Sequence, residues 1–249
     1  MGDGYVSLKH ALAEVAVDAI ARRRGVRLAG VLAAYARRSS GGAPVSLAAI
    51  AGDTGTTPSG AGRLLLRTGL FAAADGGRTT ALSPALRPFA DYFYRQVTRL
   101  GEALRLARSP RPSGVSRVIW NAIAMFNAGL FFECHEYLED AWRGASEPER
   151  TFYHGLVQAS AGLYHLEKRN LHGARVLLGK AVAKLRPYAP AYRAVDVAAL
   201  ADALEGVLAA SSATPPRLPD RRSDLPAMRL AAGVPAPAQE RPRRPGIVV

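Results

Sequence analysis

The chain has 249 residues, of which 49% are hydrophobic, with 33 lysines and arginines against 20 acidic residues. This length accommodates one large or two small domains with a substantial core. No uncharged apolar run reaches the ~18 residues of a membrane span, and the N-terminus lacks the basic start and apolar stretch of a secretory signal. We therefore expect a cytoplasmic protein without a membrane partner. The single cysteine, Cys134, excludes an intramolecular disulfide and any multi-cysteine metal site.

The positive charge is concentrated at the two ends of the sequence. Residues 1–110 carry a net charge of +8, residues 111–211 carry +1, and residues 212–249 carry +4. A clustered basic surface attracts polyanions such as nucleic acid. Alternatively, the arginines only keep an alanine-rich chain in solution, so charge alone leaves both interpretations open.

Two amphipathic helices are predicted first. Apolar residues three and four apart indicate a helix over residues 6–20 and a second helix that stops before Ser39-Ser40-Gly41-Gly42. Ser46 is then placed to cap a short helix, which the turn Asp53-Thr54-Gly55 ends.

A further helix and a hairpin follow. Thr57 and Pro58 provide an N-cap and a first-turn proline for a helix over about 58–68. Residues 70–72 and 79–82 flank a glycine turn, which predicts a β-hairpin.

This order of elements, in "VSLAAIAGDTGTTPSGAGRLLLRTGLFAAADGGRTTALSPAL", resembles the winged helix-turn-helix superfamily over about residues 26–90. In its DNA-binding members the second helix of the motif enters the major groove and the wing touches phosphates. The resemblance therefore implies nucleic-acid contacts from Ser59, Arg63, Arg67 and Arg78. The superfamily also includes dimerisation domains. Gly60 and Gly62 loosen the recognition helix, and Leu66 lies on its outward side, which favours a protein partner or a homodimer.

We expect the chain to divide into two domains and a tail. After a helix that spans about residues 86–104, the segment Ser109-Pro110-Arg111-Pro112-Ser113-Gly114 breaks the pattern. The predicted organisation is a winged-helix-like domain, a linker, a helical bundle and a disordered proline- and arginine-rich tail, over residues 1–108, 109–116, 117–211 and 212–249. Deletion of residues 213–249 is then expected to leave the melting temperature nearly unchanged.

The second domain reads as two helical hairpins, over residues 122–142 and 159–182. Cys134 and Ala174 occupy equivalent positions in the two hairpins, 40 residues apart. The arrangement resembles tetratricopeptide hairpins with a longer period. A last helix over about 195–209 is placed to close a compact bundle, so the fold class is mainly all-α.

A motif of the form F-x-x-x-H-E-x-x-E-x-x-W runs through Phe131, His135, Glu136, Glu139 and Trp142. With "FYHGLVQASAGLYHLEKRN" and "GARVLLGKAVAKL", it resembles the family known as domain of unknown function 309 over about residues 117–186. The resemblance implies a small all-helical domain and no particular activity.

The same motif supplies the candidate chemical site. On a helix, His135, Glu139 and Trp142 share one stripe, whereas Glu133 and Asp140 fall on the opposite side. In the next helix Gln158 and His165 share a face. The predicted polar cluster therefore comprises His135, Glu136, Glu139, Trp142, Gln158 and His165.

Three interpretations of this cluster remain open. His135, Glu139 and His165 are candidate metal ligands, and His135 with Glu139 could perform acid–base chemistry in a small-molecule pocket. The favoured interpretation is a buried hydrogen-bond network that fixes the helix register, because buried polar groups must be paired whether or not they react. No cofactor is expected, and Cys134 is expected to be a packing residue.

The sequence thus favours a non-enzymatic regulatory or adaptor protein. Its N-terminal domain would bind DNA or a protein partner, and its bundle would bind a peptide or a small ligand. The alternative is a small-molecule or metal-dependent enzyme centred on His135 and Glu139.

Overall fold

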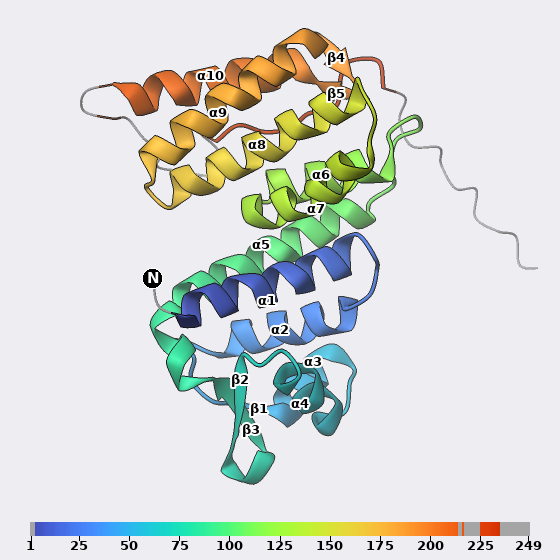
Figure 1. Cartoon of the computed structure of the whole chain (residues 1–249). Helices are drawn as coiled ribbons and strands as arrows, with labels where there is room; N and C mark the ends of the chain where they lie inside the picture. The colour runs from blue at the N-terminus through green and yellow to red at the C-terminus, as the bar shows by residue number, and fades with distance from the viewer. Residues whose placement is uncertain (1–2, 214–215, 217–224, 235–249) are drawn as a thin grey trace, which may run out of the picture.

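The computed structural model describes residues 3–213, 216 and 225–234. Over this part of the chain it contains ten α-helices and two small antiparallel sheets (Figure 1). The mainly all-α fold with a small β-hairpin is therefore confirmed. None of the described helices is long and apolar enough to cross a membrane.

Four helices form the beginning of the chain, and two of them start at the predicted caps. They are α1 (Asp3–Ile20), α2 (Val26–Arg38), α3 (Leu47–Thr54) and α4 (Pro58–Leu66). The Ser46 side chain accepts a hydrogen bond from the backbone N–H of Ala49 at the start of α3. The Thr57 side chain accepts one from the N–H of Gly60, 3.1 Å away, at the start of α4.

The predicted hairpin consists of β2 (Phe71–Ala74) and β3 (Thr79–Leu82), joined by the short turn η1 (Asp75–Gly77). A two-residue strand, β1 (Val45–Ser46), pairs with the other edge of β3, so the strand order is β1-β3-β2. Sequence periodicity missed β1 because two residues are too few to display an alternating pattern.

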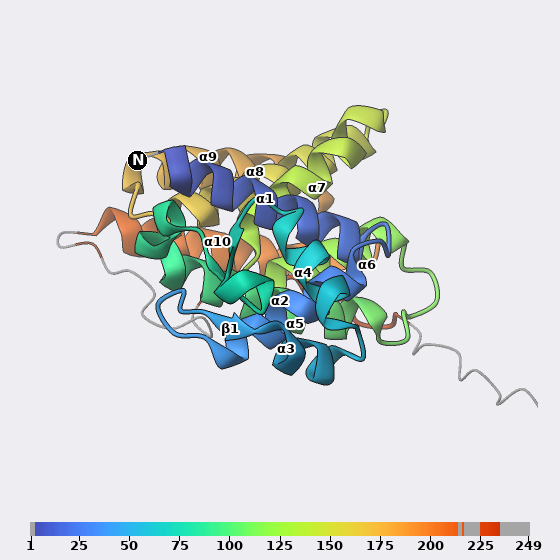
Figure 2. The same ribbon diagram turned by 90° about the horizontal axis from the view of Figure 1, so that it is seen from below.

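The middle of the molecule is formed by α5 (Ala90–Arg108), which follows the short helix η2 (Pro84–Phe89). It contacts α1 and α2 on one side and α6 on the other. Figure 1 shows the resulting stack, from the β2–β3 hairpin at one end to α10 at the other. Figure 2 views this stack from below, with α3 and α4 in front of the later helices.

The remaining helices form the two predicted hairpins and a closing helix. They are α6 (Arg117–Asn127), α7 (Phe131–Gly144), α8 (Glu149–Glu167), α9 (Leu171–Leu185) and α10 (Val197–Ser212), the last of which packs on α9. Two glycines bring α8 and α9 close together. A Cβ on Gly162 would lie 2.6 Å from Leu178 Cδ2, and one on Gly155 would lie 2.8 Å from Leu185 Cγ.

A second, unpredicted sheet lies between α9 and α10. After the short helix η3 (Arg186–Tyr188), strands β4 (Ala191–Tyr192) and β5 (Val195–Asp196) pair antiparallel. Residues 225–234 return to this sheet, where Leu230 forms a β-bridge with Val195.

The expectation of a disordered tail is therefore wrong for residues 225–234. Met228 and Pro226 in this segment are buried. The segment is too short and too rich in proline to show a helical or long strand pattern, so periodicity gave no signal. Residues 214–215, 217–224 and 235–249 of the predicted tail lie outside the described residues.

The buried apolar residues form one continuous core that extends from Tyr5 in α1 to Met228. The core crosses the predicted linker because α1 contacts both α5 and α7, and α5 contacts α6. The segment after Arg108 does separate α5 from α6, and the division into domains at this point stays a prediction.

Candidate functional site

Helix α4 presents a mixed polar and apolar face to the outside. Ser59, Arg63, Leu66 and Arg67 are all exposed and follow the three- and four-residue spacing of one helix face, while Leu65 is fully buried. All of the positions predicted for nucleic-acid contact on this helix are therefore accessible.

The glycines of α4 have different environments. A Cβ on Gly62 would lie 3.0 Å from Leu47 Cδ1, so this glycine allows α3 and α4 to pack closely. Gly60 lies beside the capping hydroxyl of Thr57. Gly62 therefore has a packing role, in addition to the conformational cost that glycine brings to a helix.

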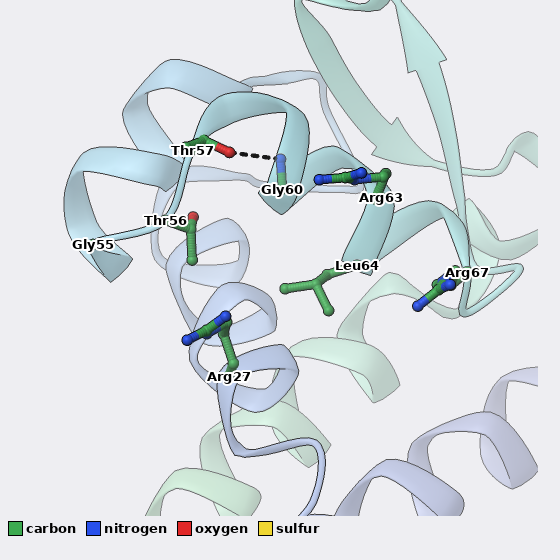
Figure 3. Close-up of a pocket in the computed structure, with 8 residues that line it drawn as sticks. All are labelled: Arg27, Gly55, Thr56, Thr57, Gly60, Arg63, Leu64 and Arg67. Carbon is green, nitrogen blue, oxygen red and sulfur yellow. Dashed lines mark hydrogen bonds between the residues drawn. The ribbon is translucent and has the colours of Figure 1, made fainter.

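A depression of about 460 Å³ lies between α4 and the start of α2 (Figure 3). It is lined by Arg27, Gly55, Thr56, Thr57, Gly60, Arg63, Leu64 and Arg67. In Figure 3 the Leu64 side chain lies between the three arginines, and the Arg27 side chain comes from α2. Sequence reasoning missed Arg27 because it lies outside the helix-turn-helix pair.

The three arginines of this depression have no carboxylate partner within the described residues. By contrast, Arg22 is paired with Asp18, and Arg38 with Asp53. A smaller neighbouring depression shares Arg67 and also contains Glu14 and Asp18, so the charge is mixed on that side. The positive charge around Arg27 and Arg63 is therefore not compensated by an ion pair within the described part of the chain.

Arg78 lies exposed at the end of the β2–β3 hairpin. Gly76 and Gly77 have φ values of 61° and 83°, which glycine adopts readily. The Thr79 hydroxyl donates a hydrogen bond to a carboxylate oxygen of Asp75, 3.0 Å away, and so closes the turn. The hairpin thus places the exposed Arg78 in a turn that is closed by a hydrogen bond.

On α7, His135 lies between two carboxylates of its own helix. Its Nε2 is 3.1 Å from Glu139 Oε1, and its Nδ1 is 3.4 Å from Glu136 Oε1. Glu139 also pairs with Arg143. The side chains of His135 and Glu139 are 22% and 23% exposed, so this part of the predicted cluster is a partly exposed network along one helix.

The other members of the predicted cluster have different neighbours. The Trp142 ring stacks on His154, with centroids 4.3 Å apart. His165 Nδ1 lies 2.8 Å from the side-chain nitrogen of Asn170. Among the described residues, no hydrogen bond or ion pair joins Gln158 or His165 to His135, and the buried Oε1 of Gln158 has no partner.

The chemistry available to these side chains is narrow. Within the described ranges, no group of three or more His, Cys, Asp and Glu residues could hold a metal ion. His154 is partly buried beneath Trp142, and burial, with the nearby Lys184, lowers its pKa. Cys134 is fully buried, and burial raises its pKa to about 12, which is unfavourable for a reactive thiolate.

The most strongly perturbed carboxylic acid of the bundle is Glu133, which sequence analysis placed on the outer side of α7. Its side chain is 0% exposed. Gln96 Nε2 of α5 donates a hydrogen bond to Glu133 Oε1, 2.9 Å away, while Oε2 has no partner in the described part of the chain. Burial raises the pKa of Glu133 to about 7.

Arg99 and Glu167 lie close enough to Glu133 to affect its pKa, where α5, α7 and α8 meet. Arg99 of α5 donates hydrogen bonds to the carbonyl of Gly129 and to Gln96 Oε1, and it pairs with Glu167 at 2.6 Å. Lys168 Nζ lies 4.2 Å from the centre of the Tyr5 ring. The contacts of Gln96 and Arg99 with Glu133, Gly129 and Glu167 thus join α5 to the second half of the chain.

A helical wheel misplaced Glu133 because it assumes a single buried face. Helix α7 is covered by α8 on one side, and its first turn also faces α5 through the Gln96 contact. The available signal was the glutamine in the apolar stripe of the preceding long helix, since a buried amide requires a polar partner.

Comparisons with known proteins concern the second half of the chain. Residues 119–177 match the family model described as Domain of unknown function (DUF309). A curated protein of Bacillus subtilis (strain 168), named Uncharacterized protein YpuF, is 36% identical over 53 residues. The match comprises 21% of this chain and 30% of that protein, so it spans less than one third of the curated relative. No solved structure matches the chain at a significant level.

The matched residues extend from α6 into α9 and include the histidine–glutamate motif of α7. The winged-helix resemblance of the N-terminal half stays a prediction. Residues 119–177 of this chain are therefore similar to the DUF309 family, as the motif around His135 and Glu139 predicts.

Proposed function

We propose that this chain binds duplex DNA through a winged helix built from α2, α3, α4 and the β2–β3 hairpin. The observation that carries the proposal is the convergence of Arg27, Arg63 and Arg67 on one depression without a carboxylate partner in the described residues. Arginines that only keep a protein in solution need not lie close together. A bound phosphate, by contrast, is contacted by several neighbouring arginines.

In this arrangement α4 is the recognition helix and β2–β3 is the wing. Arg63 and Arg67 are one helical turn apart, roughly 6 Å along the axis, and they flank the exposed Leu66. Arginine reads guanine edges and phosphates, and an aliphatic side chain can contact a thymine methyl group. Arg27 supports a phosphate contact beside the helix, and Arg78 supports one from the wing.

A protein-contact role for the same face is the second candidate, and Leu66 favours it. This side chain is 44% exposed, on the same helix face as Arg63 and Arg67, where it could pack against an apolar partner. The two roles differ in their response to salt, because phosphate contacts release counterions and apolar contacts do not.

The test is fluorescence anisotropy with a labelled mixed-sequence duplex of about 25 base pairs at several salt concentrations. Arg63→Ala is expected to reduce the slope of log K against log salt by about one. Arg105→Ala is the control, since it removes the same charge from an exposed site near the end of α5. An equal effect of both substitutions, or no binding by the wild type at low salt, would refute the proposal.

A further inference from the structure

We infer that β5 and the end of α6 form a recognition site for an extended peptide, and that residues 225–234 are its resident ligand. The inference is independent of DNA binding, since it concerns the opposite half of the molecule. The class of partner is an extended segment with a large apolar anchor and a second apolar residue two positions later, as in Met228 and Leu230.

The site forms hydrogen bonds with the main chain of the segment at two places. Asn127, the last residue of α6, donates from Nδ2 to the carbonyl of Met228 (2.8 Å) and accepts from its N–H through Oδ1 (2.9 Å). At β5, Asp196 N–H donates to the carbonyl of Arg229, and Ala231 N–H donates to the carbonyl of Ala194, both at 3.0 Å. The segment thereby pairs with β5 through an isolated β-bridge between Leu230 and Val195, and pairing with a strand edge is how many proteins bind extended peptides.

The side chains of the segment alternate as an extended ligand requires. Pro226 and Met228 are buried, Arg229 is exposed, and Leu230 is partly buried. Met228 is 1% exposed and belongs to the hydrophobic core. Main-chain hydrogen bonds thus supply affinity for any extended segment, and burial of the Met228 side chain in the core supplies the selectivity.

The receptor side of this contact is fixed by interactions that do not involve the segment. Strand β5 pairs with β4 through Val195 and Tyr192, and the Asp196 side chain caps α10 by accepting from Ala199 N–H at 3.0 Å. The strand edge therefore persists when the segment leaves. A tethered ligand holds such a site at an effective concentration in the millimolar range, so it excludes an external peptide until it is released.

The experiment releases the segment after the full chain has folded. Residues 217–224 are replaced by a protease recognition sequence, the protein is cut, and the C-terminal fragment is removed by dialysis. A fluorescent peptide of residues 225–234 is then titrated into the cut and the intact protein. We expect saturable binding to the cut protein and at least tenfold weaker binding to the intact protein.

Matched variants identify the contacts. Met228→Ala in the peptide is expected to weaken binding at least tenfold, whereas Arg229→Ala, at an exposed position, leaves it within twofold. Asn127→Ala in the protein is expected to weaken binding at least tenfold while circular dichroism shows an unchanged helix content.

Two results would overturn the inference. In one, the fragment remains attached and millimolar peptide does not displace it, or the cut protein loses its helical signal when the fragment leaves; the segment would then be an integral part of the core. In the other, Met228→Ala and Arg229→Ala peptides bind equally well, and the contact would not be a specific site.

Discussion

Glu133→Gln is expected to stabilise the protein above neutral pH. Glu133 is fully buried, its Oε1 accepts from Gln96, and its pKa is raised from 4.5 to about 7. Between these two values the folded state holds a proton that the unfolded chain has released. The stability from this group is therefore fully present below about pH 4.5 and is lost as the pH rises through about 7.

The magnitude follows from the pKa shift. At about 1.4 kcal/mol per pKa unit, a rise from 4.5 to about 7 corresponds to roughly 3 kcal/mol of stability lost between mildly acidic and mildly basic pH. Glutamine keeps the oxygen that accepts from Gln96 and has no charge to bury. The variant is therefore expected to lose none of this stability and to exceed the wild type by up to about 3 kcal/mol at pH 8.

The assay is urea unfolding followed by circular dichroism at pH 5, 6, 7 and 8, with the unfolding free energy compared at each pH. Asp140→Asn is the control on the same helix, since Asp140 is 73% exposed and its substitution is expected to change stability by less than about 0.5 kcal/mol. Parallel pH curves for wild type and Glu133→Gln, or a less stable variant at pH 8, would refute the reasoning.

Three further expectations follow from packing. Gly162→Ala is expected to cost about 1–3 kcal/mol in urea unfolding through overpacking, whereas Gly179→Ala, where a Cβ meets nothing within 4 Å, is expected to stabilise by about 0.5–1 kcal/mol. Trp142→Ala exposes the His154 ring, so the lowered pKa of His154 is expected to rise toward 6.5 in an NMR titration. An unchanged pKa of His154 would contradict the stacking contact. Met228→Ala is expected to cost about 2–5 kcal/mol, and a thermal melt with an unchanged midpoint would show that the segment does not dock.

The sequence predicted the helices well because their signals are local. Ser46 and Thr57 are caps that act within three residues, and both make the predicted hydrogen bonds. The hairpins of the bundle were predicted because each contains two long apolar stripes around a short turn. The β2–β3 hairpin was predicted from its glycine turn, which also acts locally.

The errors concern contacts between residues far apart in the chain. Glu133 meets Gln96 across 37 positions, and Asn127 meets Met228 across 101 positions. Neither contact produces a periodic pattern in the sequence of either segment. The candidate cluster on α7 was predicted only in part for the same reason: His135 and Glu139 share a helix, whereas their approach to His165 depended on how two helices are rotated.

The continuous core has a thermodynamic consequence for the whole molecule. Because α1 packs on both α5 and α7, neither half can unfold without exposing apolar surface of the other. We therefore expect the described part of the chain to unfold as one cooperative unit, in a single transition whose steepness reflects all of its buried area. A ligand bound at α4 at one hundred times its Kd adds about 2.7 kcal/mol to the stability of that unit. Its binding therefore slows hydrogen exchange at the globally protected amides of α9 as much as at those of α2.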